Sequence, residues 1–352
     1  MFKKKSLLII ALVLVLSIVV SACSSNQEPA TNNGSSSDAG DSPSTSDLRP
    51  EGVPADFPNK EIEYIYGFGP GSVQDAYIRI LFDKVQKMEG WDHGMVVNYR
   101  EGASGKIGWN AIADADPDGY TIGFVPSAML IPGIADADTV NFGYDEYAYI
   151  FNMMSDPGAI GVAIDSEYET LDELVEAARK NPNTITVGVT STIGQEGLTM
   201  KLIERAGDVG FNVVAFNGEA DVLAGVVGGH VDAFCLNITD TTTFLENGQI
   251  KVLATGATER SEFLPDVPTY AEAGYDVVQV NMRAVGGPKD MPEPIRQYLE
   301  NCLLAAAADP EVQEQIANMQ IPLDSLGGQE IYDAFGNIYS GLVELWEAEP
   351  WQ

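Results

Sequence analysis

The segment Tyr64-Ile65-Tyr66-Gly67-Phe68-Gly69-Pro70-Gly71-Ser72-Val73-Gln74-Asp75 decides the fold of this 352-residue chain. Its apolar start predicts a strand, and small or φ-restricted residues at Gly69, Pro70 and Gly71 suit a tight turn. Ser72 then has the spacing of a helix N-cap, and apolar residues follow at helical spacing. Such a unit leaves N–H groups free at the helix N-terminus, where a carboxylate can bind. An ordinary turn without a ligand explains the same residues.

A second unit of the same kind follows about 120 residues later, counted along the printed sequence. The strand 185–189 leads into a turn that contains Ser191, Thr192 and Gly194, and Gln195 lies three residues after Thr192, as in a capping box. If the two turns face each other across a cleft, they can hold one ligand between two domains.

Polar residues follow three other predicted strands. Ser127 lies at the carboxyl end of one strand, where open α/β sheets place ligands, and Asn217 follows another. Asn237, Thr239 and Thr241 follow a third, and they either line the same cleft or cap a helix.

Arg283 lies in an apolar strand of an acid-rich chain, so its charge needs a partner. The partner is either a ligand carboxylate bound in a bidentate manner or a nearby Asp or Glu.

We expect further strands at 121–125, 147–150, 161–164, 213–216, 231–234, 251–255 and 277–285. A loop should separate the strands 147–150 and 161–164. We expect helices at 171–179, 219–227, 294–308, 311–319 and 329–346.

The N-terminus predicts export and a lipid anchor. Lys3 to Lys5 precede an apolar run that is short for a membrane span, and small residues then lead to Cys23. We expect a lipoprotein signal over residues 1–22, a lipidated Cys23, and a flexible Ser-, Gly- and Asp-rich tether over 23–56. An ordinary secretory signal or a retained anchor is the alternative.

Composition excludes several functions. A formal charge of −33 argues against a nucleic-acid partner. His93 and His230 are the only histidines and are far apart, so we expect no metal, no cofactor and no histidine-based catalysis. The sequence has no motif that would mark a catalytic nucleophile, so we do not expect an enzyme. We expect Cys235 and Cys302 to be buried, unpaired thiols, although the sequence does not exclude a disulfide.

The ordered string of motifs resembles the solute-binding receptors of tripartite tricarboxylate transporters, also called Bug proteins. The resemblance runs from Phe57 to about Trp346. It rests on Phe68 to Asp75, Gly102 to Gly108, Pro117 to Thr121, Phe216 to Gly218, Gly228 to Asp232, and Leu264 to Gly274. It implies an α/β type II periplasmic-binding-protein fold, in which two crossover strands join domain one (57–159 plus 280–352) to domain two (160–279) and a ligand cleft lies between them.

The resemblance implies a monomeric, non-enzymatic receptor that holds a ligand carboxylate at Gly69 to Ser72 and at Ser191 to Gln195. It would deliver a small organic acid to membrane permease subunits. Ser72, Asn217, Leu236 and Arg283 depart from the family pattern. The added Arg283 favours a di- or tricarboxylate, while an amino acid, an aromatic acid or a sugar acid stays open. With its lipid anchor, the receptor would lie on the outer face of the cytoplasmic membrane, extracellular or periplasmic. A ligand-binding sensor or accessory lipoprotein for signalling is the alternative role.

Overall fold

The structure, a computed structural model, describes residues 48–348 and residue 350. The predicted signal, Cys23 and the first part of the predicted tether lie outside these residues. In the part that is described, no helix combines the length and the apolar character that a membrane span requires.

One set of strands forms the sheet of what we call the first lobe. Its order is β2-β1-β3-β9-β4, and β10 also pairs with β4. The strands are β1 (Ile62–Tyr66), β2 (Met95–Tyr99), β3 (Thr121–Pro126), β4 (Tyr147–Ala163), β9 (Val280–Pro288) and β10 (Leu323–Gly327). Its helices are α1 (Val73–Glu89), α2 (Lys106–Ala113), α3 (Leu130–Ala135), α8 (Glu293–Ala307), α9 (Pro310–Asn318) and α10 (Gly328–Ala348).

A second set of strands forms the second lobe. Here the order is β6-β5-β7-β4, and β8 pairs with β4 as well. The strands are β5 (Thr186–Val189), β6 (Asn212–Ala215), β7 (Ala233–Asn237) and β8 (Ile250–Thr255), and the helices are α4 (Leu171–Lys180), α5 (Gln195–Gly207), α6 (Glu219–Val227) and α7 (Ile238–Glu246). Because β5, β6 and β7 are parallel, their carboxyl ends lie at one edge of the sheet.

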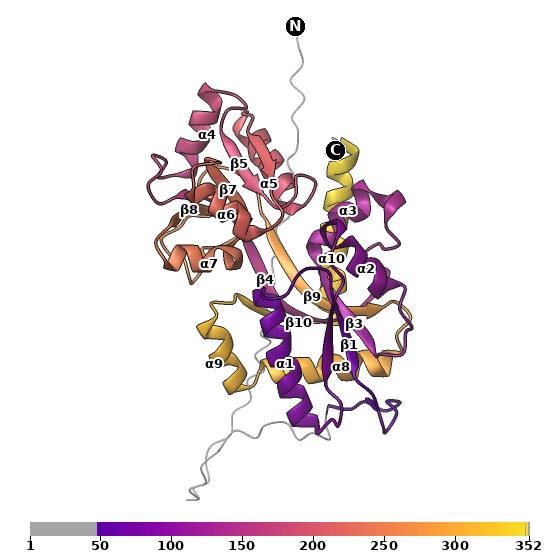
Figure 1. Cartoon of the computed structure of the whole chain (residues 1–352). Helices are drawn as coiled ribbons and strands as arrows, with labels where there is room; N and C mark the ends of the chain where they lie inside the picture. Colours follow the sequence, from indigo (N-terminus) through magenta and orange to yellow (C-terminus); the bar gives the residue numbers. More distant parts are fainter. Residues whose placement is uncertain (1–47, 349, 351–352) are drawn as a thin grey trace, which may run out of the picture. The chain divides into compact units, whose positions relative to one another are not determined.

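The long strand β4 belongs to both lobes and corrects the sequence prediction. Its residues 147–157 pair with β9, and residues 158–163 pair with β7 and β8 (Figure 1). Two short strands and a loop were expected there because of Pro157 and Gly158. Gly158 instead marks a close approach of two chain segments, since an added Cβ would lie 1.9 Å from the Gln279 side chain.

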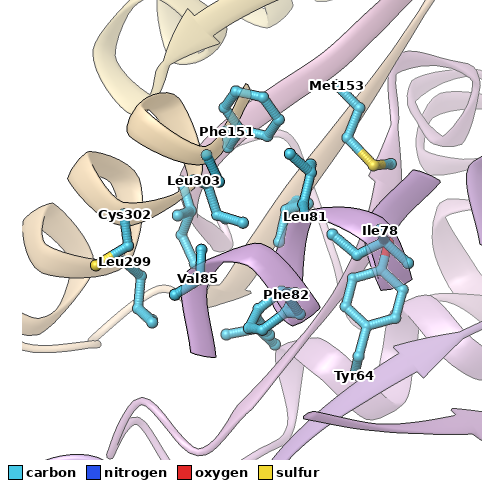
Figure 2. Packing of buried hydrophobic residues seen from close by; sticks show 14 of the residues in the cluster. Tyr64, Ile78, Leu81, Phe82, Val85, Phe151, Met153, Leu299, Cys302 and Leu303 are labelled. Carbon is cyan, nitrogen blue, oxygen red and sulfur yellow. The ribbon is translucent and has the colours of Figure 1, made fainter. Parts of the chain in front are cut away.

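Each sheet is covered on both faces. In the first lobe, α1, α8 and α9 cover one face, and α2, α3 and α10 cover the other. Alternation along β1 explains this, because Tyr64 packs toward α1 and the neighbouring Ile65 packs toward α2. Figure 2 shows the first of these cores, where Leu81 and Val85 of α1 meet Leu303 of α8. In the second lobe, α4 and α5 pack on one face, and α6 and α7 on the other.

The folded body starts before the predicted end of the tether. Leu48 is buried in the core of the first lobe. Arg49 donates hydrogen bonds to the carbonyl of Phe57 at 2.8 Å and to the hydroxyl of Tyr298 at 2.9 Å. Leu48 and Arg49 therefore pack on the lobe, so the flexible tether predicted over residues 23–56 extends too far at its end. The polar composition of the segment gave no sign that Leu48 would be buried or that Arg49 would donate hydrogen bonds to three acceptors.

The remaining differences concern single elements, and neither β2 nor α3 was predicted from the sequence. The strand expected from Val231 begins at Ala233, and β10 was not predicted because its residues Leu323 to Gly327 are partly exposed and carry no strong alternation. Cys235 and Cys302 are free and buried, as expected, and they belong to the cores of different lobes.

Candidate ligand-binding site

The turn between β1 and α1 is built as predicted, but part of its hydrogen-bonding capacity is already used. Ser72 is the N-cap of α1, and its Oγ accepts a hydrogen bond from the backbone N–H of Asp75 at 3.1 Å. The Asp75 carboxylate accepts the N–H of Gly71 at 3.2 Å. Gly71 has a φ of +98°, which explains the glycine at this position. The hydroxyl of Tyr66 lies 2.7 Å from Ser72 Oγ, so the end of β1 is tied to the turn.

The turn between β5 and α5 differs from the prediction. The helix begins at Gln195, Gly194 is its N-cap, and no side chain caps it, so the expected capping by Thr192 is wrong. The turn backbone lies directly against the helix, because a Cβ on Gly197 would come within 2.1 Å of the Thr192 carbonyl oxygen. Ser191 is half-buried and Thr192 is exposed.

Arg283 is the centre of a buried charged cluster where β4 and β9 run together between the lobes. Its Nη2 lies 2.7 Å from Oδ2 of Asp156 and 3.6 Å from Oδ1 of Asp240. Asp156 is completely buried and also accepts the backbone N–H and the hydroxyl of Thr239. Burial would lower the pKa of Arg283, but the charges of Asp156 and Asp240 outweigh this effect and raise it.

From the sequence, the partner of Arg283 was either a ligand carboxylate or an acidic residue of the protein. In the structure, Asp156 of the protein is that partner. The guanidinium still has capacity, because its Nε–H has no acceptor in the described protein and the residue is only 6% exposed. A β-bulge explains its position, since Met153 and Met154 of β4 together lie opposite Arg283 on β9.

Asp240 and two further carboxylates lie where helices begin after the strands of the second lobe. Glu196, Glu219 and Asp240 are in the first turns of α5, α6 and α7. Burial raises the pKa of Glu196 to about 7, and the charges of Asp240 and Glu219 add to this rise. Glu219 reaches solvent, yet the protein atoms around it and the charge of Asp240 also raise its pKa.

Tyr66 connects the two lobes electrostatically. Burial raises its pKa to about 12, the hydrogen bond with Ser72 and the charge of Arg283 oppose the rise, and the charges of Glu219 and Asp240 add to it. The turn after β1, the guanidinium of Arg283 and the first turns of α6 and α7 therefore lie within electrostatic reach of one another.

The other predicted residues have mixed positions. Ser127 is buried, and its Oγ accepts the N–H of Met282 at 3.0 Å, so it links β3 to β9 beside Arg283. Asn237 is buried and donates its backbone N–H to Asp240 at 3.1 Å. Thr239 and Thr241 hydrogen-bond inside the protein. Asn217 is exposed and lines a separate surface cavity of 490 Å³ with Asp221 and His230.

Sequence reasoning missed Tyr66, Asp156, Glu196, Glu219 and Asp240. The sequence did carry a signal for Glu196, Glu219 and Asp240. Each of them follows a predicted strand of the second lobe by a few positions and lies in the first turn of a helix. Asp156 was hidden in the stretch interpreted as a loop. Among residues 48–348, no group of three or more His, Cys, Asp or Glu has an arrangement that could hold a metal ion.

Comparison with known proteins supports one family. The model of the "Tripartite tricarboxylate transporter family receptor" matches residues 78–332. A UPF0065 protein of Agrobacterium vitis is 28% identical over 269 residues, which cover 75% of this chain and 76% of the relative. Two solved structures share the fold at 21% identity over 83% of this chain. One is an R. palustris protein with adipate (TM-score 0.72, 97% of that chain covered) and the other is MatC of Rhodopseudomonas palustris with bound malate (TM-score 0.70, 99% covered).

The expected fold is thereby confirmed, because the solved periplasmic binding protein BugD has the same fold, with a TM-score of 0.73 and 24% identity over 83% of this chain and 98% of that chain. The family match covers more than two thirds of the chain. The chain belongs to the family of tripartite tricarboxylate transporter receptors, which are solute-binding proteins of the periplasmic binding type.

Proposed function

We propose that the protein is the lipid-anchored receptor of a tripartite transporter, that it captures a small organic acid by closure of its two lobes, and that it delivers the acid to membrane permease subunits. The observation that carries this proposal is the position of Arg283. The residue lies where β4 and β9 connect the lobes, and its Nε–H lacks an acceptor.

The binding mode follows from this position. A ligand carboxylate at the turn after β1 would lie near Ser72 and Tyr66, and it would accept a hydrogen bond from Arg283 of β9 in the same lobe. The second lobe would then close over the ligand. Closure is favoured only if the ligand interacts better with the closed form than with the open form. The related structures with adipate and malate support an organic acid as the class of ligand. No covalent step is part of the proposal.

A thermal-shift screen of the purified full-length protein tests the function. Mono-, di- and tricarboxylates, amino acids and sugars are compared at equal concentration. A ligand present at one hundred times its dissociation constant is expected to stabilise the protein by roughly 2.7 kcal/mol. The Ser72→Ala variant is expected to weaken this shift, and Ser340→Ala, far along α10, is the control. A flat response to every acid would overturn the proposal.

The lipid anchor is tested separately. We expect fatty-acid label to appear on the exported protein and to be absent from Cys23→Ser, because the thiol of Cys23 is the acylation site that the sequence predicts. Cys235→Ser is the matched control, since that thiol is buried and free. Equal labelling of the wild type and Cys23→Ser would contradict the anchor without affecting the proposed ligand.

A further inference from the structure

The edge of the second lobe that faces Arg283 is acidic at three consecutive helices. Each of α5, α6 and α7 starts just after a parallel strand and has a carboxylate in its first turn, namely Glu196, Glu219 and Asp240. Burial raises the pKa of Glu196, and the charges of Asp240 and Glu219 add to this rise; the charge of Asp240 also raises the pKa of Glu219. The three side chains therefore form one cluster, which we call the acidic edge.

The acidic edge changes what the helix N-termini can bind. A free helix N-terminus attracts an anion because its N–H groups point outward. Here the protein's own carboxylates already accept such groups. Asp240 accepts the N–H of Asn237, and Glu196 and Glu219 each hydrogen-bond to their own backbone. A second ligand carboxylate would meet negative charge at this edge.

The protein balances the negative charge of the edge only in part, because Asp240 pairs with Arg283. Glu196 and Glu219 form no ion pair with a Lys or Arg anywhere in residues 48–348. In residues 48–348, Asp240 is the member of the edge that pairs with a cation, Arg283 at 3.6 Å, and Arg283 is already held by Asp156 at 2.7 Å. Ionised carboxylates that are crowded together favour a cation between them.

Arg283 gives an independent sign of a ligand. The residue is 6% exposed, and its Nε–H has no acceptor among the described atoms. A buried donor without an acceptor costs free energy, and a ligand oxygen would remove that cost. The guanidinium therefore requires an acceptor oxygen, while the neighbouring acidic edge requires a positive charge.

We infer that the ligand is zwitterionic: an organic acid with an ammonium or quaternary ammonium group, whose cationic group lies against Glu196, Glu219 and Asp240 and whose carboxylate lies at Arg283 and the turn after β1. This inference rests on the proposed function and narrows its ligand class. It replaces the di- or tricarboxylate that the isolated Arg283 suggested from the sequence, because the structure surrounds that arginine with carboxylates.

Isothermal titration calorimetry with matched ligand pairs tests the inference. The pairs are succinate with aspartate, glutarate with glutamate, and butyrate with γ-aminobutyrate, and glycine betaine tests a quaternary ammonium. We expect the amino member of at least one pair to bind at least about tenfold more tightly than the matching plain acid, which is the effect of one charge-assisted hydrogen bond. Glycine betaine has no N–H to donate, so its binding would report the attraction between the charges alone. Tighter binding of the plain acids would overturn the inference and leave the proposed function standing.

A charge variant locates the cationic group. Glu219→Gln is expected to weaken binding of the zwitterion about tenfold, as the loss of a charged hydrogen-bonding partner does. Asp221→Asn is the matched control. Asp221 lies in the first turn of the same helix but does not belong to the acidic edge, so this variant should keep the affinity for the zwitterion. Equal effects of the two variants, or none from Glu219→Gln, would overturn the inference.

The pH dependence separates the inference from its rival, in which the acidic edge becomes protonated to admit a dicarboxylate. Glu196 is neutral below its pKa of about 7 and charged above it. Affinity for a zwitterion should therefore rise between pH 6 and pH 8, whereas affinity for a dicarboxylate should fall. Falling affinity overturns the inference, and the absence of binding by every compound overturns the proposed function as well.

Discussion

The pair formed by Asp156 and Arg283 has a different energetic role from the ion pairs on the surface. Both side chains are nearly or fully removed from water, so each charge depends on the other. Replacement of one partner leaves an uncompensated buried charge, which is far more costly than the loss of an exposed pair. The two hydrogen bonds from Thr239 add to the number of groups that depend on Asp156.

We expect Asp156→Ala to lower the free energy of unfolding by about 3–5 kcal/mol, because it leaves Arg283 buried without its partner. The double variant Asp156→Ala/Arg283→Met is expected to recover part of this loss, since it removes the stranded charge. Urea unfolding followed by tryptophan fluorescence measures both.

The control for this prediction is Asp83→Ala. Asp83 pairs with Lys87 on α1 with both side chains more than 60% exposed, so its loss should change stability by less than about 0.5 kcal/mol. If Asp156→Ala were no more destabilising than Asp83→Ala, the buried pair would contribute little to the folded state.

At the scale of the element, the strand–turn–helix units could be predicted from the sequence, whereas the long strand β4 could not. The strand–turn–helix units around Ser72 and Gly194 have local signals, namely an apolar run, a small-residue turn and helical spacing, and both are present. The strand β4 has no such signal, because Pro157 and Gly158 interrupt it at the point where it leaves one sheet for the other. Pairing with β9, a contact distant in sequence, maintains the strand there.

The candidate site follows the same division. Arg283 was recognisable as an isolated charge in an apolar strand, but its partner Asp156 lies 127 residues away, and only the fold brings them together. Likewise, no local pattern indicates that Glu196, Glu219 and Asp240 gather at one edge. Their proximity depends on three parallel strands that end together. The di- or tricarboxylate predicted from Arg283 alone therefore took no account of these three acidic residues.

At the scale of the whole molecule, a second contact joins the lobes away from β4 and β9. Leu198 and Leu202 of α5 pack with Ile131 of α3 and with Leu342 and Leu345 of α10, and Leu198 is 7% exposed. The helix α5 belongs to the second lobe, whereas α3 and α10 belong to the first. Apolar burial that exists only while the lobes are in contact favours the closed form over the open form.

We therefore expect Leu198→Ala to shift the protein toward an open form. The loss of about 1 kcal/mol of apolar burial that is specific to the closed form should weaken ligand affinity about fivefold. Small-angle X-ray scattering of the ligand-free protein should show a larger radius of gyration, and calorimetry measures the affinity. Leu304→Ala is the matched control, because Leu304 is a half-buried leucine of α8 that packs within the first lobe only. The control should lose stability and keep both the radius and the affinity, so the same increase in both variants would show that this contact has no specific role in closure.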